Sequence, residues 1–214
     1  HRIMDWNGTP ELKALYAIED PFSYRERLTM PKLLINASGD QFFLPDSSQF
    51  YFGALPGEKF LRYIPNTDHG MKNTDAYQTL GAWHHVILNR TPLPQFSWQR
   101  AADGTLIVTA KTKPTAALLW KATNPKARDF RLETLGPVWT STPLTADGDT
   151  FTAKAVAPTA GWTASFIELT FDVGARDPLK LTTDIAVTPD TLPFPAPTLE
   201  KPKGFLQNAT KPAR

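Results

Sequence analysis

The feature that most constrains the fold of this chain is a change of pattern at Thr91-Pro92-Leu93-Pro94. Before this stretch, apolar residues at helical spacing alternate with short apolar runs that are typical of buried strands. After it, short β-rich runs recur between turn signals. Because proline disfavours both helix interiors and central strands, the stretch predicts a linker between two parts of different architecture.

The first part alternates helix and strand signals. Helices are predicted at residues 9–18, 46–52 and 74–89, because each begins with a capping side chain and continues with apolar residues at helical spacing. The nearly continuous apolar runs at 31–37 and 60–65 predict strands that are covered on both faces. Strands joined by crossover helices run parallel. The first part therefore predicts an α/β fold with an open parallel sheet.

The second part is predicted to be all-β. Its β-rich runs are separated by turn sequences such as Asp103-Gly104 and Asp147-Gly148. Several short strands at this spacing predict a β-sandwich of immunoglobulin-like or fibronectin-like shape. The runs are residues 105–111, 116–122, 130–134, 150–156, 165–173 and 179–187.

These patterns divide the chain into three segments. Residues 1–92 form the α/β part, residues 93–190 form the β-sandwich, and residues 191–214 form a proline-rich tail. The predicted fold class is thus α/β followed by all-β.

Composition excludes several kinds of site. The chain has no cysteine, which rules out disulfides, thiolate metal sites and thiol catalysis. A formal net charge of +2 is not typical of a nucleic-acid-binding protein. No apolar run approaches the roughly 18 residues that a membrane-spanning helix needs. We therefore expect no nucleic-acid partner, no transmembrane segment, no metal and no cofactor.

Two loops of the first part carry residues that are suited to catalysis. Asp40 follows the strand at 31–37, and His69 follows the strand at 60–65. Loops at the carboxyl ends of adjacent parallel strands meet at one edge of a sheet, where α/β proteins collect functional groups. A carboxylate beside an imidazole fixes its tautomer and stabilises the imidazolium that forms when a nucleophile loses its proton. The pair therefore predicts the acid and the base of a catalytic triad.

Other interpretations of these polar residues remain open. Asp40 and His69 are also compatible with turn and surface roles, which are common for such loop residues. Asp46 precedes Ser47-Ser48 and a predicted helix, which indicates an N-cap. Asp68 is a weaker rival acid, because it would point away from its neighbour His69. The pair His84-His85 is an unsuitable metal site, because adjacent helical side chains point in different directions.

No serine of the chain fits the role of nucleophile. None stands in Gly-x-Ser-x-Gly or at a strand-to-helix elbow before Asp40. In α/β-hydrolases the nucleophile precedes the acid in the chain. We therefore expect it upstream of His1, on the same polypeptide or on a separate chain, and we expect this chain alone to be inactive.

Long stretches of the sequence resemble the PhoPQ-activated pathogenicity-related family, which belongs to the α/β-hydrolase superfamily. The most specific stretch is residues 17–32, with Asp-Pro-Phe-Ser-Tyr-Arg-Glu-Arg-Leu at 20–28. The resemblance continues through residues 33–46, 55–59, 65–69, 161–164, 168–170 and 188–194.

The resemblance implies the C-terminal part of an α/β-hydrolase with a C-terminal β domain, in an exported bacterial protein that is secreted or periplasmic. It implies a serine nucleophile upstream, with Asp40 as the acid and His69 as the base. The expected substrate is a peptide, an amide or an ester. Phe42 and Phe43, next to the acid, are candidates for a substrate pocket, although we expect at least one of them to be buried in the core.

The same resemblance also admits a protein without enzymatic turnover. A related eukaryotic group contains secreted proliferation-repressing factors, which act as signals. In such a binding or signalling protein, Asp40 and His69 would be remnants or local hydrogen-bonding groups. The residue at the upstream nucleophile position distinguishes the two hypotheses.

Overall fold

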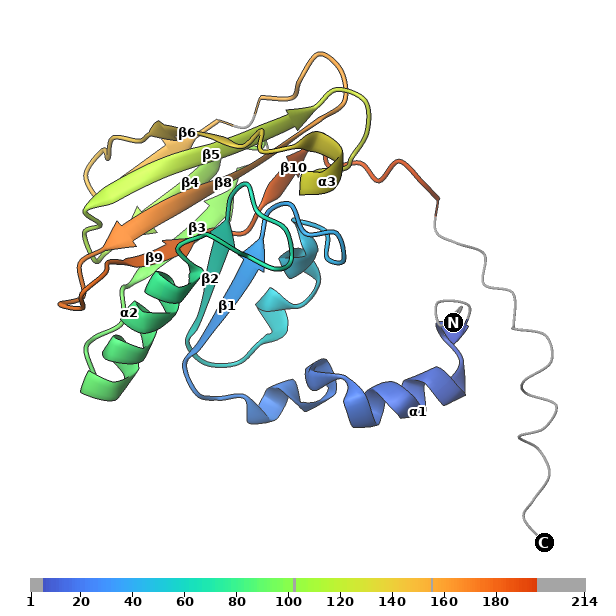
Figure 1. Ribbon diagram of the computed structural model, residues 1–214, viewed down its shortest axis with the longest axis horizontal. Helices are drawn as coiled ribbons and strands as arrows, with labels where there is room; N and C mark the ends of the chain where they lie inside the picture. Colours follow the sequence, from blue (N-terminus) through green and yellow to red (C-terminus); the bar gives the residue numbers. More distant parts are fainter. Residues whose placement is uncertain (1–5, 102, 155, 196–214) are drawn as a thin grey trace, which may run out of the picture.

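The computed structural model of the chain describes residues 6–101, 103–154 and 156–195 (Figure 1). Most elements of the first part agree with the sequence prediction, including the start of the first helix, where the Thr9 hydroxyl accepts a hydrogen bond from Leu12 N at 3.3 Å. The elements are α1 (Pro10–Glu19), the 3-10 helix η2 (Pro21–Arg27), β1 (Lys32–Ala37), β2 (Lys59–Ile64) and α2 (Ala76–Asn89).

The helix predicted at residues 46–52 is wrong in type. Two short 3-10 helices, η3 (Ser47–Phe50) and η4 (Phe52–Ala54), occupy this region. Asp46 does precede η3, but its side chain makes no capping hydrogen bond. Its carboxylate instead accepts hydrogen bonds from the side chains of Gln49 and Arg128.

The second part is built of strands, but two of the predictions for it need correction. The run at 130–134 is not a strand: it forms the short helix α3 (Leu132–Leu135), which starts where the Asp129 carboxylate accepts a hydrogen bond from Arg131 N. The run at 179–187 is two strands rather than one. The strands are β3 (Phe96–Arg100), β4 (Leu106–Ala110), β5 (Ala116–Asn124), β6 (Thr140–Pro143), β7 (Thr150–Ala153), β8 (Trp162–Phe171), β9 (Leu179–Thr182) and β10 (Ala186–Thr188). Of the predicted tail, residues 191–195 have no helix or strand, and the rest lies outside the described residues.

One sheet spans both predicted parts. Its strand order is β1-β2-β9-β8-β5-β6, with β10 paired to β8, and a smaller antiparallel sheet has the order β3-β4-β7. Strands β1 and β2 are parallel, as predicted, but β2 pairs antiparallel with β9 through Leu61 and Thr182. The open parallel sheet is therefore a single parallel pair within a mixed sheet, and the fold is mixed α/β. The division into separate domains near residue 92 stays a prediction.

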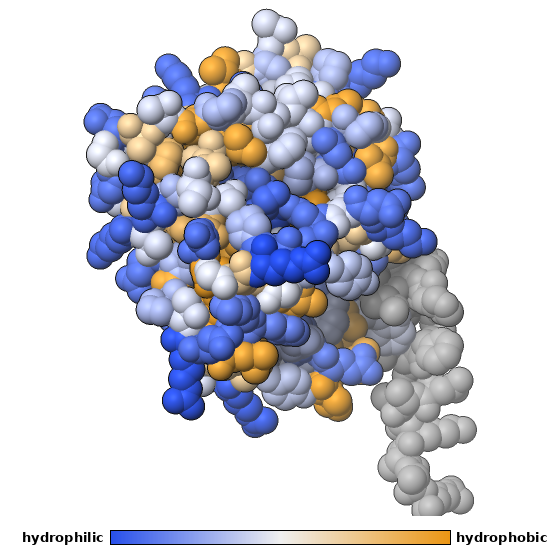
Figure 2. Space-filling model, turned by 60° about the vertical axis from the view of Figure 1, so that its left-hand side comes forward, coloured by the Kyte–Doolittle hydropathy of each residue, from blue (hydrophilic) through white to orange (hydrophobic). Residues whose placement is uncertain are grey.

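Two hydrophobic clusters stabilise this arrangement on opposite faces of the large sheet. Alternate residues of a strand point to opposite faces: Leu169 belongs to the first cluster and Phe166 to the second. The first cluster joins Phe60 of β2 and Trp83 of α2 to Val108 of the small sheet, so it contains residues from both predicted parts. On the face of the molecule seen in Figure 2, the exposed hydrophobic residues are scattered among hydrophilic ones.

A network of charges also crosses between the two parts. Arg62 of β2 is 1% exposed, and one of its terminal nitrogens donates a hydrogen bond to the Glu168 carboxylate of β8, which is 3% exposed. Its second terminal nitrogen donates to both Asp75 oxygens, at 2.8 and 2.9 Å. Lys180 of β9 donates to Asp75 Oδ2 at 2.7 Å. Each buried charge in this network therefore has a partner of opposite sign, as burial requires.

Asp75 makes the stability of the fold sensitive to acid. Burial raises the pKa of the Asp75 carboxyl, but Arg62 and Lys180 together outweigh burial and hold the pKa below its ordinary value of 3.8. A carboxyl whose pKa is lowered by folding contributes stability above its ordinary pKa, and this contribution is lost as the pH falls through the lower, folded value. We expect urea titrations to give a steadily falling free energy of unfolding below pH 3.8, with a shallower fall in Asp75→Asn. An identical acid profile for the two proteins would contradict this account.

Candidate functional site

The loops after β1 and β2 bring Asp40 and His69 together. His69 Nδ1 lies 2.8 Å from Asp40 Oδ2, within hydrogen-bond distance. The Asp40 side chain is 5% exposed, whereas the His69 side chain is 49% exposed. Because β1 and β2 are parallel and in register through Ala37 and Ile64, both loops leave the sheet at the same edge. The structure thus pairs a buried carboxylate with a half-exposed imidazole.

The Asp40 carboxylate is held by its own loop as well. Its Oδ1 atom accepts hydrogen bonds from the backbone N–H groups of Phe42, at 2.7 Å, and Phe43, at 3.1 Å. An aspartate that binds the backbone a few residues ahead forms a local turn. Asp40 is therefore a turn residue and a partner of His69 at the same time, with one oxygen in each role.

Several hydrogen bonds tie the two loops to each other. They fix the backbone on both sides of the Asp40–His69 contact, so the position of each side chain depends on the other loop. The bonds run from Ser38 N to Ile64 O (2.9 Å), from Gly39 N to Thr67 O (3.0 Å), from Asn66 N to Ser38 Oγ (3.2 Å) and from His69 N to Gln41 Oε1 (3.2 Å).

Phe42 and Phe43 flank the imidazole of His69. The ring centroids of Phe42 and His69 are 5.1 Å apart with an edge-to-face angle of 82°, and those of Phe43 and His69 are 5.7 Å apart. Phe42 is 71% exposed and Phe43 is 59% exposed, so the expectation that at least one of them is buried in the core is wrong. Leu44 in the same loop is also exposed, so the loop presents three apolar side chains to its surroundings. Their role in a substrate pocket stays a prediction.

The rival residues lie in other environments. The Asp46 carboxylate is buried against Arg128, and Asp68 accepts a hydrogen bond from Gly70 N at 2.9 Å. His84 is exposed on α2, and the side chain of its neighbour His85 lies next to Asn89.

Among the residues that the structure describes, no group of three or more His, Cys, Asp or Glu side chains could hold a metal ion. In the same ranges, no helix is long and apolar enough to cross a membrane.

Sequence reasoning missed the residues that connect this site to the second part. Asn66 has a left-handed backbone with φ of 56°, which asparagine tolerates better than most residues. Its side-chain amide binds the backbone of Trp139 in both directions, at 2.8 Å each. An asparagine directly after a strand and a proline was the only sequence signal, and it indicated no more than a turn.

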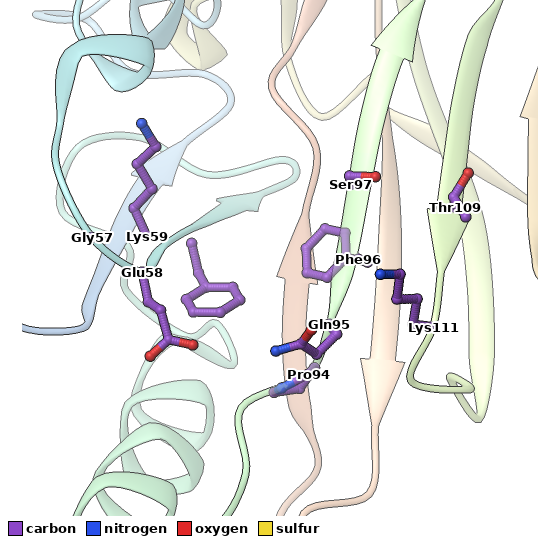
Figure 3. Close-up of a pocket in the computed structure, with 10 residues that line it drawn as sticks. Gly57, Glu58, Lys59, Pro94, Gln95, Phe96, Ser97, Thr109 and Lys111 are labelled. Carbon is purple, nitrogen blue, oxygen red and sulfur yellow. The ribbon is translucent and has the colours of Figure 1, made fainter.

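The hollow in Figure 3 lies away from the Asp40–His69 pair. This cavity of about 340 Å³ is lined by residues 57–60, at the amino end of β2, by residues 94–97, and by Thr109 and Lys111. His69 follows the carboxyl end of β2, so the cavity and the pair lie at opposite ends of this strand. The rings of Phe60 and Phe96 in the lining are 6.2 Å apart and continue the aromatic core.

Comparisons with known proteins identify the family. Residues 1–131 match the family described as PhoPQ-activated pathogenicity-related protein. The chain belongs to this family. Because the match ends at residue 131, it does not include the resembling stretches at 161–194. Both Asp40 and His69 lie inside it.

A curated relative extends the similarity along the chain. The chain is 31% identical over 220 residues to autocrine proliferation repressor protein A of Dictyostelium discoideum. The alignment covers 90% of this chain but 44% of the relative, so the chain spans less than half the length of that protein. No solved structure matches the chain.

Proposed function

We propose that this chain supplies the acid and the histidine of a serine hydrolase of the α/β-hydrolase type, with Asp40 as the acid and His69 as the base. The observation that carries the proposal is the 2.8 Å contact between Asp40 Oδ2 and His69 Nδ1. An anionic carboxylate at Nδ1 holds the ring proton there and leaves Nε2 with a free lone pair. The half-exposed imidazole can then receive a proton from a second partner.

In the proposed reaction, that partner is a serine hydroxyl. Nε2 of His69 takes the hydroxyl proton as the oxygen attacks the carbonyl carbon of a peptide, amide or ester, and the proton then passes to the leaving group. Water, activated in the same way, releases the acyl group. The serine and the oxyanion donors would come from a segment upstream in the longer proteins of the family, on the same polypeptide or on a separate chain. The alignment covers 44% of the relative, so a protein of that length has room for such a segment.

The arrangement of strands supports a finer description of the fold. We assign β1, β2 and α2 to the C-terminal end of an α/β-hydrolase sheet. Strands β3 to β9 form two facing sheets, of order β3-β4-β7 and β6-β5-β8-β9. Because β6 pairs with β5 rather than with the smaller sheet, this order favours the fibronectin-like over the immunoglobulin constant-type sandwich. By family membership we further propose an exported protein, secreted or periplasmic.

Labelling with a serine-directed fluorophosphonate tests the proposal. The natural polypeptide that contains this chain is expected to be labelled at one serine, and His69→Ala is expected to abolish labelling because the serine loses its base. His84→Ala is the matched control: His84 is exposed on α2, so its removal should leave labelling unchanged. Full labelling of His69→Ala, or no labelling of the unsubstituted polypeptide, would reject the hydrolase.

A second function, that of a binding or signalling protein, is favoured by one observation. The relative is named as an autocrine proliferation repressor. In this case the apolar loop surface around Phe42 and Phe43 would contact a protein partner, and His69 would need no nucleophile. A natural polypeptide that resists fluorophosphonate but loses partner binding in Phe42→Ser would support this alternative.

A further inference from the structure

One segment of the second part, residues 128–139, contacts both loops of the candidate site. It includes the short helix α3, which Figure 1 shows beside the loops that follow β1 and β2. The segment makes three separate connections, and each reaches a residue close in sequence to Asp40 or His69. They are Trp139 with Asn66, Leu132 N with Gly39 O, and Arg128 with Asp46.

The connection through Asn66 is reciprocal. Asn66 Nδ2 donates to Trp139 O, and Trp139 N donates to Asn66 Oδ1, both at 2.8 Å. Trp139 is itself firmly placed, because it is 4% exposed and its ring lies 5.3 Å from that of Phe166 of β8. Asn66 lies three residues before His69. Its two hydrogen bonds therefore fix the loop that carries His69 relative to Trp139.

The connection through Gly39 depends on close contact. Leu132 N donates to Gly39 O at 2.9 Å. A Cβ atom on Gly39 would lie 2.9 Å from both Leu132 N and Thr67 O, which is too close for any side chain. Gly39 directly precedes Asp40, so α3 and the histidine loop together enclose the backbone from which the acid projects.

The third connection is a buried ion pair. Arg128 and Asp46 have side chains that are 5% and 4% exposed. Asp46 ends the loop that begins at Asp40, so the pair fixes the far end of this loop. A buried pair of this kind resists separation, because removal of one partner leaves an uncompensated charge.

We propose that residues 128–139 are a brace for the Asp40–His69 pair, and that Asn66 is the positioning residue through which the brace holds His69. Neither Asn66 nor the brace takes part in the chemistry. The brace deepens the proposed function, because through it the β part sets the geometry of the acid and the base. The importance of the brace for catalysis rests on the proposed function, whereas its effect on the Asp40–His69 contact does not.

Nuclear magnetic resonance of the full chain tests the brace. The Nδ1 proton of His69, hydrogen-bonded to Asp40, should give a signal at low field that exchanges slowly with water. Asn66→Gly retains the positive φ but lacks the side-chain amide. Because the two hydrogen bonds to Trp139 are lost, we expect the Nδ1 proton of His69 to exchange at least about fivefold faster. Asn66→Asp keeps the acceptor for Trp139 N and should restore part of the protection.

A matched control isolates the amide of Asn66 from its backbone conformation. Asn73 is exposed and also has a positive φ, of 58°, so Asn73→Gly makes the same change outside the brace and should leave the exchange unchanged. Gly39→Ala disturbs the brace from its other side and should also speed the exchange. Unchanged exchange in Asn66→Gly, with native circular dichroism, would overturn the proposal.

The outcomes of this experiment and of the labelling experiment are independent. If no serine reacts with fluorophosphonate, the hydrolase fails while the exchange measurement still reports on the brace. If the exchange is insensitive to Asn66, the brace fails while labelling and its dependence on His69 stand.

Discussion

Replacing Asp40 by asparagine is expected to slow fluorophosphonate labelling of the natural polypeptide by about four orders of magnitude. The amide oxygen still accepts from the backbone of Phe42 and Phe43, so the turn survives. The amide nitrogen, however, faces His69 Nδ1 as a donor and favours the tautomer with its proton on Nε2. That tautomer cannot accept the serine proton, so the loss reflects the wrong protonation state and not a collapsed loop.

The second-order rate constant for labelling is the quantity to measure. Asp68→Asn provides the matched control, because Asp68 lies beside His69 in sequence but binds Gly70 N instead of the imidazole. We expect the control to label at nearly the unsubstituted rate. A rate for Asp40→Asn within about tenfold of the unsubstituted rate would mean that Asp40 does not set the tautomer of a catalytic histidine.

Glu168→Ala is expected to lower the free energy of unfolding by about 3–5 kcal/mol, the usual cost of removing one partner from a buried ion pair. Arg62 is almost completely buried and donates to both Glu168 and Asp75. Without Glu168, one of its terminal nitrogens keeps only the carbonyl of Tyr63 as an acceptor. Chemical denaturation followed by tryptophan fluorescence measures the change.

Two further variants separate the charge from the packing. Glu133→Ala removes an exposed partner of Arg131 and should have little effect, because exposed ion pairs contribute little. The double variant Arg62→Met with Glu168→Leu removes both buried charges and should regain much of the stability that Glu168→Ala loses. If the double variant is less stable than Glu168→Ala, the ion pair stabilises the fold by itself, and the cost of Glu168→Ala is not only that of an uncompensated Arg62 charge.

The candidate site was largely predictable because its geometry follows from local rules. The apolar runs around Leu34 and Leu61 indicated strands, and a helix-containing crossover between strands imposes a parallel pair. Burial on both faces was correctly predicted for β2 but is wrong for β1, which lies at the sheet edge and is mostly half-buried. Parallel strands end at the same edge, so Asp40 and His69 had to lie near each other. The same reasoning gave the limits of α1 and α2, where capping residues and helical spacing agree.

The long-range pairing could not be predicted in this way. Arg62 interrupts the apolar run of β2 and signals a buried charge, but its partner Glu168 lies 106 residues away in sequence. Nothing local selects that glutamate. The pairing of β2 with β9 rests on a single bridge between Leu61 and Thr182, and no pattern in either strand encodes it. The prediction of a separate all-β part therefore missed the strand through which the two parts share one sheet.

Weak strands and short helices account for the other errors. Residues 140–143 of β6 are all exposed, so no alternation of apolar and polar residues marks them. The run at 130–134 has the composition of a strand, but the side chain of Asp129 binds Arg131 N and starts a turn of helix there. Local side-chain contacts of this kind compete with the sheet, and composition does not reveal which one prevails.

The sheet that continues from β1 to β6 couples the two parts of the chain across residue 92. Bending between the two parts would break the β2–β9 pairing and separate the buried Arg62 of β2 from Glu168 of β8. Any such motion would therefore have to leave two charges buried without their partners.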